Sequence, residues 1–304
     1  METVHHRMRR AREDVIYDTI IFIILTLIFL IVAYPLYFVV ISSFSDPVKV
    51  AGGKVILVPV GFTLDGYKEV FKTQAVMRGF LNSLIYTAVG VGVNLAVTIP
   101  TSYALSRKDF PLNRPITLFY IVTMFVGGGM MPTYLVVRDT GLLNTMWALI
   151  LPGALGVYNM IVARTFFTTN IPSELMEAAK LDGCGNTRFF AYIVLPLSGA
   201  IIAILFLYYG VGHWNSYFSA LIYITDRNKF PLQLELRNIL LQNSVNMTKT
   251  VMTEEELAEK ERLEALKEMM KYSLIIISSI PVLVIYPFVQ KHFVKGVMIG
   301  SVKG

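Results

Sequence analysis

The residue types that most often carry catalysis are scarce in this chain. Its 304 residues include four histidines and a single cysteine, Cys184, and they show neither metal-ligand spacing nor a nucleophile paired with a base. A phosphate-binding loop of the form G-x-x-x-x-G-K-[ST] does not occur, since the glycines near 127 and 183 lack its lysine. We therefore expect a protein that is not an enzyme and binds no metal or cofactor of its own.

The segment from Glu177 to Pro196 combines residue types that suit a mechanical contact with another protein. Glu177 offers an anionic group. Ala178 and Ala179 allow a second backbone to approach closely, and Gly183 permits a sharp reversal of the chain. A helix of about nine residues is marginal by itself and needs docking to be stable. The alternative is an ordinary helical hairpin at the membrane interface.

The capping residues predict a helix, a turn and a second helix in this segment. Ser173 can cap a helix that begins at Glu174, and Gly183 suits the left-handed residue that ends it. Asn186 can cap the second helix, and Pro196 then fits the first turn of the next apolar stretch.

A second group of candidate residues is aromatic and lies near the outer end of the fifth apolar stretch. Flat rings can cover the apolar faces of a sugar, while Asn215 and Ser216 can bond its hydroxyl groups. An aromatic belt at the membrane interface is the favoured alternative. The aromatic residues are Tyr208, Tyr209, Trp214, Tyr217 and Tyr223. The candidates for a substrate path are Asn82, Tyr209, Trp214, Asn215 and Tyr217.

The elements that position these residues must lie in a bilayer. Hydrophobic residues make up 55% of the chain and charged residues only 16%, a balance too apolar for a soluble domain of this length. A helix needs roughly 20 apolar residues to cross the hydrocarbon. Six stretches qualify, at about 19–42, 79–105, 116–137, 146–166, 197–224 and 272–293. The predicted fold is an all-α membrane protein with six spans and a cytoplasmic helix pair between spans four and five.

The N-terminal tail orients these spans. Arg7, Arg9, Arg10 and Arg12 precede the first span, and positive residues beside a first helix tend to remain in the cytoplasm. Six spans then place both termini inside. The apolar run that begins at Thr19 is too long for a cleaved signal peptide. The formal charge of +6 is spread over the loops, so we expect membrane lipid rather than nucleic acid as its partner.

The domain organisation follows from the spans. We predict a cytoplasmic tail at 1–18, a membrane domain at 19–293 and a second cytoplasmic tail at 294–304. The membrane domain includes the cytoplasmic loop 168–196 and two outside loops, 43–78 and 225–271.

The second outside loop ends in a charged helical pattern. Thr253 and Glu256 form a capping box, and no break signal precedes the last span, so one helix is predicted from about Glu254 to Val289. Four pairs are spaced to interact on one face: Glu256/Lys260, Glu259/Arg262, Glu264/Lys267 and Glu268/Lys271.

Two features inside the spans bear on mechanism. Gly127-Gly128-Gly129 and Pro132 predict a loosened or broken third span. The three glycines serve either close helix packing, which we favour, or an unwound stretch at a cavity. The spans hold almost no ionisable residue apart from tyrosines and His213, which disfavours an ion-coupled carrier. We expect His213 to be a structural hydrogen-bonding residue.

The spacing within Glu177–Pro196 resembles the EAA loop of the membrane subunits of ATP-binding-cassette (ABC) importers. It reads E-A-A-x3-G-x9-I-x-L-P, and the resemblance extends from about Ile20 to Gly304. It is most similar to the second-type permease of carbohydrate importers, of the maltose and complex-polysaccharide types. Weaker signatures are Asn82-Ser83, Tyr103-Ala104-Leu105-Ser106-Arg107, Pro132, Leu142-Leu143-Asn144-Thr145, Trp214-Asn215 and Val302-Lys303-Gly304.

The resemblance implies a non-catalytic permease subunit of an ATP-driven importer for oligosaccharides or polysaccharide fragments in the plasma (inner) membrane. It implies four kinds of partner: a second homologous permease, two ATPase subunits that bind Mg-ATP, an extracytoplasmic solute-binding protein and lipid. The residues that would couple the permease to the ATPase are Glu177, Ala178, Ala179, Asp182, Gly183, Ile193, Leu195 and Pro196.

Other readings stay open beside this one. The tail Lys295–Gly304 would either enter the ATPase dimer interface or be disordered. A permease for a non-sugar solute, and an ATP-independent channel or carrier, remain alternatives.

Overall fold

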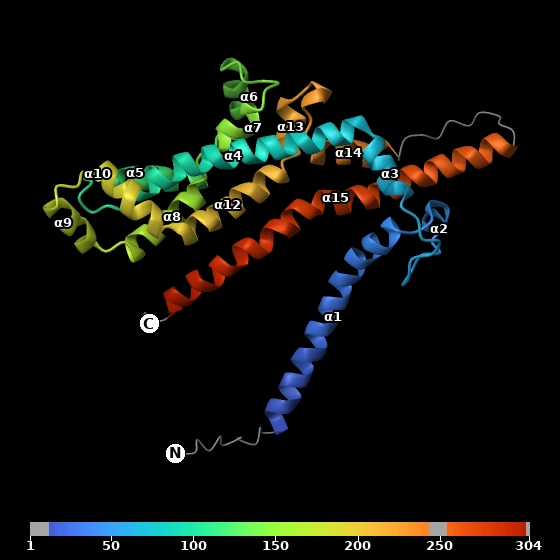
Figure 1. Cartoon of the computed structure of the whole chain (residues 1–304), viewed down its shortest axis with the longest axis horizontal. Helices are drawn as coiled ribbons and strands as arrows, with labels where there is room; N and C mark the ends of the chain where they lie inside the picture. The colour runs from blue at the N-terminus through green and yellow to red at the C-terminus, as the bar shows by residue number, and fades with distance from the viewer. Residues whose placement is uncertain (1–11, 243–253, 302–304) are drawn as a thin grey trace. The chain divides into compact units, whose positions relative to one another are not determined.

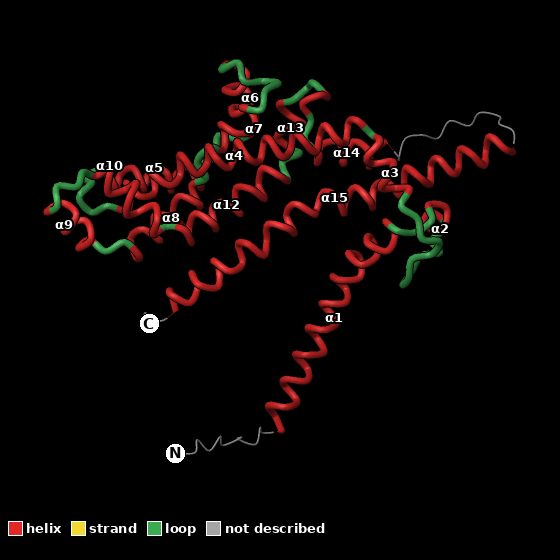
Figure 2. Tube along the Cα trace, in the orientation of Figure 1, coloured by secondary structure: helices red, strands yellow, loops and turns green. Residues whose placement is uncertain are grey.

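The computed structural model describes residues 12–242 and 254–301. Every element in these two ranges is helical, and Figure 2 draws no strand among them. The predicted all-α class is confirmed. The helices are α1 (Arg12–Ser43), α2 (Pro47–Ala51), α3 (Asp65–Lys72), α4 (Gln74–Ser106), α5 (Asn113–Phe125), α6 (Met130–Asp139), α7 (Trp147–Ile150), α8 (Val157–Asn170), α9 (Ser173–Leu181), α10 (Asn186–Phe189), α11 (Leu195–Leu197), α12 (Gly199–Trp214), α13 (Phe218–Tyr223), α14 (Leu232–Gln242) and α15 (Glu254–Ser301).

The chain divides into two compact units. The first comprises residues 1–69 and 248–276, and the second comprises residues 70–247 and 277–304. The second unit contains the segment Glu177–Pro196 and all the candidate residues of the substrate path.

Three helices are long and apolar enough to cross a membrane without interruption. They are α1 over Ile16–Ser43, α4 over its whole length, and α15 over Glu264–Pro287. Three further candidates are bent pairs, which raises the total to as many as six. The bends are 114° between α5 and α6, 50° between Trp147–Gly153 and α8, and 79° between Asn186–Leu197 and α12.

The bends correct the prediction of continuous spans at 146–166 and 197–224. In the second case α12 ends at Trp214, and α13 begins only at Phe218. The break in the third stretch is confirmed, because α5 ends at Phe125 and α6 begins at Met130. Hydropathy depends on composition alone, so it finds an apolar stretch but not a bend within it.

The glycines of the third stretch do not serve close packing within the described chain. A Cβ built at Gly127 or Gly129 would have no neighbour within 4 Å, and at Gly128 it would meet only Pro132. Gly129 instead adopts a φ of +86°, which a side chain would strain. Among the described residues these glycines form no close helix contact, and Gly129 serves the change of direction.

The core of the second unit forms where α4 packs against α8 and α12 (Figure 1). Side chains of α4, α8, α9, α10 and α12 form one buried cluster, with Tyr103, Phe167, Phe189 and Leu205 among its members. Since α9 and α10 contribute to the same cluster, the predicted helix pair is packed onto the ends of the spans.

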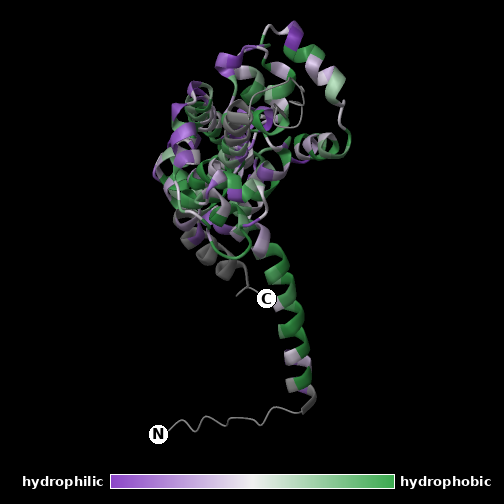
Figure 3. Cartoon of the chain, turned by 90° about the vertical axis from the view of Figure 1, so that its right-hand side faces the viewer, coloured by the Kyte–Doolittle hydropathy of each residue, from purple (hydrophilic) through white to green (hydrophobic). Residues whose placement is uncertain are grey.

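The first unit has a small core and an unburied helix. Ile41, Val50 and Val55 are buried together, with Phe38 and Tyr272 packed against them. Figure 3 colours most of α1 as hydrophobic, and no residue in the most apolar stretch of this helix is buried within the chain. Lipid or another protein must cover this stretch.

The last helix continues beyond the predicted Val289 and reaches Ser301. Of the predicted pairs, Glu268 and Lys271 form an ion pair at 2.6 Å. Thr253, the N-terminal arginines Arg7, Arg9 and Arg10, and the terminal Val302–Gly304 lie outside the described residues.

Candidate functional site

Helix α9 has two faces of opposite character. Met176 and Ala179 are 5% and 7% exposed and join the core cluster. Glu177 and Ala178 are exposed, and Leu181 is 90% exposed. Of the two alanines expected to admit a partner backbone, Ala178 is exposed, whereas the small side chain of Ala179 fits the core of its own unit.

Gly183 ends α9 as predicted. Its φ is +74°, and no heavy atom lies within 4 Å of a Cβ built there, so the backbone conformation and not space requires glycine. The Cys184 amide donates to the Ala179 carbonyl at 2.8 Å, and the Gly183 amide donates to Lys180 at 3.0 Å. These two bonds are the Schellman pattern of a helix C-terminus. They leave Asp182 exposed beside the turn.

The predicted N-terminal caps are not formed. Pro172 occupies the N-cap position of α9, and Ser173 is its first helical residue. Gly185 occupies the corresponding position of α10, ahead of Asn186. Neither helix has a side-chain cap bond, because each predicted capping residue lies one position too late.

The second half of the motif, residues 190–196, packs largely against the core cluster that also holds α9. Residues Phe190–Val194 form a π-helical turn that leads into α11. Ile193 and Leu195 pack against the core cluster, while Pro196 is exposed in α11, just before the bend to α12. The EAA residues therefore divide into an outward set at Glu177, Ala178, Asp182 and Gly183 and an inward set at Ala179, Ile193 and Leu195.

An ionic link ties α9 to the loop that follows α4. Lys180 Nζ lies 3.5 Å from Asp109 Oδ2. Arg107 Nε donates to Asp109 Oδ1 at 2.7 Å, its second terminal nitrogen contacts Oδ2, and its first donates to the Tyr103 hydroxyl at 3.0 Å. The Arg107 hydrogen bond lowers the pKa of Asp109. No local pattern in the sequence marks Asp109 or Lys180, because nothing local connects residues so far apart in the chain.

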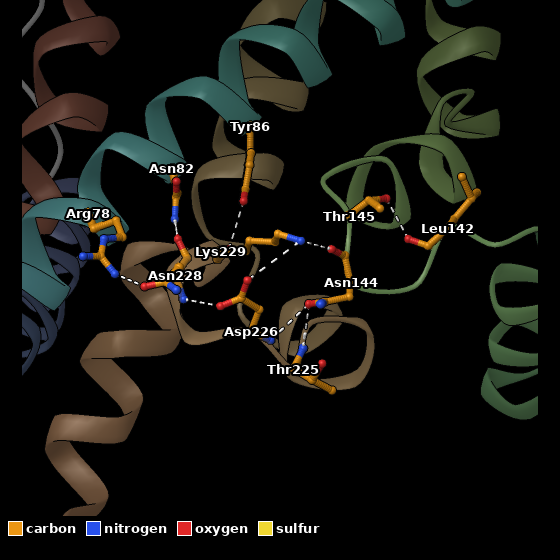
Figure 4. Close-up of polar contacts among 10 residues, drawn as sticks. All are labelled: Arg78, Asn82, Tyr86, Leu142, Asn144, Thr145, Thr225, Asp226, Asn228 and Lys229. Carbon is orange, nitrogen blue, oxygen red and sulfur yellow. Dashed lines mark hydrogen bonds and ion pairs between the residues drawn. The ribbon is translucent and has the colours of Figure 1, made fainter.

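Asn82 belongs to a polar network at the first turns of α4 (Figure 4). Its side-chain nitrogen donates to the carbonyls of Asn228 and Phe230 at 2.8 and 3.0 Å. One turn later, the Tyr86 hydroxyl donates to the Lys229 carbonyl at 3.0 Å. Asn82 thus fastens the turn before α14 to α4, and both hydrogens of its amide are used within the chain.

Asn144 supports the same network from the loop before α7. It has a φ of 59°, and its side-chain oxygen accepts hydrogen bonds from the amides of Thr225 and Asp226. Lys229 Nζ donates to the Asn144 carbonyl at 2.8 Å. Asn144 therefore joins the α6–α7 loop to the segment after α13, as Figure 4 shows.

The aromatic candidates have separate environments. Tyr209 is 7% exposed, and its hydroxyl lies 2.7 Å from Thr98 Oγ1. Trp214 is 3% exposed and donates to the Ser278 carbonyl at 2.8 Å. Asn215 and Tyr217 are exposed in the break between α12 and α13.

The five candidates for a substrate path do not form one site. Asn82 and Thr98, the partner of Tyr209, are separated along α4 by about 24 Å at 1.5 Å per residue. Only Asn215 and Tyr217 combine adjacency with exposure.

His213 forms a buried polar contact between helices. Its Nε2 lies 2.6 Å from Asn94 Oδ1, and the Asn94 amide nitrogen donates to the carbonyls of Gly153 and Ala154. A Cβ at Gly90 would lie 2.5 Å from the same His213 nitrogen. The contact joins α4, α12 and the bend before α8, as expected for a structural histidine.

Glu235 in α14 is a buried acid that the sequence analysis did not single out. It is 3% exposed, and Oε1 has no hydrogen-bond partner among the described residues. Burial raises the pKa of Glu235, and the charge of Arg227 partly opposes this. Among the described residues, no three His, Cys, Asp or Glu side chains are placed to hold a metal ion.

No protein-family model matches the chain. The chain is 39% identical to the polygalacturonan/rhamnogalacturonan transport system permease protein YtcP of Bacillus subtilis (strain 168), over 95% of this chain and 99% of that protein. It is 37% identical to protein LplC of the same organism, over 98% and 99%. Among solved structures it resembles a bacterial ABC transporter involved in the import of the acidic polysaccharide alginate, with a TM-score of 0.84, 28% identity, and coverage of 94% and 99%. The chain therefore belongs to the family of ABC-transporter permease subunits that includes permeases of carbohydrate transport systems.

Proposed function

We propose that this permease subunit imports oligosaccharides or polysaccharide fragments and is driven through the outward face of α9 by a separate ATPase subunit. In this proposal a second homologous permease completes the pathway, two ATPase subunits bind Mg-ATP, and an extracytoplasmic solute-binding protein delivers the substrate. The chain crosses the plasma membrane six times, counting each bent pair as one span, with both termini cytoplasmic.

The observation that carries the coupling proposal is the composition of the outward face of α9. Leu181 is 90% exposed beside Glu177 and Ala178 in a helix of nine residues. Burying one leucine side chain contributes about 1.5–3 kcal/mol. A groove on the ATPase that covers Leu181 and pairs with Glu177 would therefore stabilise this short helix in the assembly.

The inward face of α9 provides a route from the ATPase to the spans. Met176 and Ala179 pack in the same cluster as Tyr103 of α4 and Phe167 of α8. A close-packed interior transmits displacement. Movement of α9 on closure of the ATPases would thus shift the adjoining ends of α4 and α8 and select between two global states.

The substrate class rests on the relatives. One transports polygalacturonan or rhamnogalacturonan by its name, and the solved transporter is described as importing alginate. All three words denote polysaccharides, so fragments of a polysaccharide are the solutes we expect.

Uptake by the assembled transporter, reconstituted in vesicles with its binding protein, tests both the coupling through α9 and the substrate class. We expect ATP-dependent uptake of labelled galacturonan or alginate oligosaccharides. In the double variant Glu177→Lys/Gly183→Ala the rate of this uptake should fall at least about tenfold, since loss of a central contact costs on the order of 2 kcal/mol. Stimulation of the ATPase should be lost in parallel, while membrane insertion stays normal.

The control is Asp139→Lys, a charge reversal at another exposed carboxylate, at the end of α6, and it should transport normally. Normal uptake by the double variant would overturn the coupling proposal. ATP-dependent uptake restricted to a non-sugar solute would overturn the substrate class alone, and uptake without ATP would indicate a channel or carrier.

A further inference from the structure

The loop after α2 carries an apolar tip. Ile56, Leu57 and Val58 are 59%, 64% and 64% exposed, and the following Pro59 is exposed as well. Four consecutive exposed apolar residues are unusual in a loop that faces water. Their side chains therefore need a cover that this chain does not supply.

The base of the loop is firmly fixed, so the tip has a defined position. Val55, just before the tip, is 3% exposed and packs with Ile41. Just after the tip, the Val60 amide donates to Ser45 Oγ at 3.2 Å, and the Val60 carbonyl accepts from the Asp46 amide at 3.0 Å. The tip is held on both sides against the end of α1.

The tip turns back along α1 and does not extend away from it (Figure 1). The Tyr37 hydroxyl donates to the Leu57 carbonyl at 2.6 Å, and the Tyr34 hydroxyl donates to the Ile56 carbonyl at 3.3 Å. Along a helix that rises 1.5 Å per residue, Tyr37 and Tyr34 lie about 9 and about 14 Å before the end of α1 at Ser43. The tip thus reaches back beside the apolar part of the helix.

This depth corresponds to the boundary between head groups and hydrocarbon. The candidate span Ile16–Ser43 is about 42 Å long, close to the total thickness of a bilayer of about 40–45 Å, of which about 30 Å is hydrocarbon. Tyr37 then falls near the edge of the hydrocarbon, and Tyr34 one turn deeper. Tyrosines are enriched at this level.

Two carbonyls of the tip have hydrogen-bond partners that suit the interface of a bilayer. An unpaired carbonyl costs several kcal/mol where water is absent. The carbonyls of Ile56 and Leu57 receive their partners from the two tyrosines, while Lys54, exposed just before the tip, can reach lipid phosphates with its long side chain. With the orientation given under the proposed function, on which this inference rests, we propose that residues 56–59 insert into the outer leaflet at its interface and anchor the first outside loop to lipid.

Depth-dependent fluorescence quenching tests the insertion. In a Cys184→Ser background, the Leu57→Cys variant of the complete transporter is labelled with an environment-sensitive fluorophore and reconstituted in phosphatidylcholine/phosphatidylglycerol vesicles. We expect spin labels on the upper acyl chain to quench position 57 several-fold more strongly than aqueous iodide does. The Lys68→Cys control lies on α3 with a side chain that is 65% exposed, and it should show the reverse order.

The Val58→Cys variant repeats the measurement in case a label at position 57 disturbs the loop. If iodide quenches positions 57 and 58 as strongly as position 68, the tip lies in water and the proposal is wrong. Protection from both quenchers would also overturn it, since that result would mean that another protein chain covers the tip.

Discussion

Gly90 and Gly92 lie two residues apart in α4 and have different surroundings. A Cβ at Gly90 would lie 2.5 Å from His213 Nε2, the nitrogen that contacts Asn94, whereas a Cβ at Gly92 would have no neighbour within 4 Å. The first glycine is required by the close approach of a side chain from α12. The second has no such constraint.

We expect the two alanine substitutions to have opposite effects on stability. Gly90→Ala must displace His213 and break its contact with Asn94, which should lower the free energy of unfolding by about 1–3 kcal/mol. Gly92→Ala should be neutral or stabilising by up to about 1 kcal/mol, because alanine favours the helix. The thermal midpoints of the purified, detergent-solubilised variants measure this difference, and equal midpoints would show that His213 moves aside at no cost.

The motif residues of α9 show the same dependence on position at the scale of one helix. The sequence pattern treats Ala178 and Ala179 alike, but the helix turns about 100° per residue, so one faces out and the other faces the core. Only the outward residue is available to a partner.

The Asp109–Lys180 pair is expected to matter for coupling more than for stability. Both side chains are about half exposed, at 48% and 53%, and pairs of this kind contribute about 0–1 kcal/mol. Lys180→Glu should therefore leave the thermal midpoint nearly unchanged while it reduces ATP-driven uptake. Lys180→Arg, which keeps the positive charge, should take up substrate at the normal rate.

Two further variants separate the possible causes. Lys68→Glu alters another exposed lysine, paired with Asp65 in α3, and should transport normally. Asp109→Asn should reproduce the loss if the pair itself transmits movement. If Asp109→Asn transports normally and only Lys180→Glu is defective, Lys180 acts by contacting the ATPase directly.

The charge of Asp109 is not expected to change near neutral pH. Arg107 lowers the folded-state pKa of Asp109 below the value of about 3.9 for an unperturbed aspartate. A lowered carboxyl pKa contributes stability that is present above the unfolded pKa and is lost as the pH falls through the folded pKa. The Asp109 carboxylate in the α4–α5 loop therefore stays ionised throughout the physiological pH range.

At the scale of the whole molecule, the orientation proposal has a direct test in Cys184, the only cysteine of the chain. This residue is partly exposed and follows the turn that ends α9. A membrane-impermeant maleimide should label Cys184 only after the membrane is opened or inverted. The Lys68→Cys variant in a Cys184→Ser background should label in intact cells or protoplasts. Labelling of Cys184 in intact cells would show that the proposed orientation is wrong.

The sequence alone determined the fold class and the family. Both depend on local properties, because an apolar stretch of about 20 residues predicts a span wherever it occurs, and the motif from Glu177 to Pro196 is one short segment. The left-handed turn at Gly183 and the break that ends at Gly129 were also predictable, since glycine is the residue that such turns require.

The tertiary structure alone decided which of these residues are exposed, which are buried and which residues support them. The bends within the fourth and fifth stretches, the burial of Ala179 and the contacts of Asn82 all depend on segments distant in the chain. The link between Asp109 and Lys180 is of the same kind. A local pattern fixes the conformation of a residue and its preference for lipid or water, but its neighbours are known only once the helices have packed.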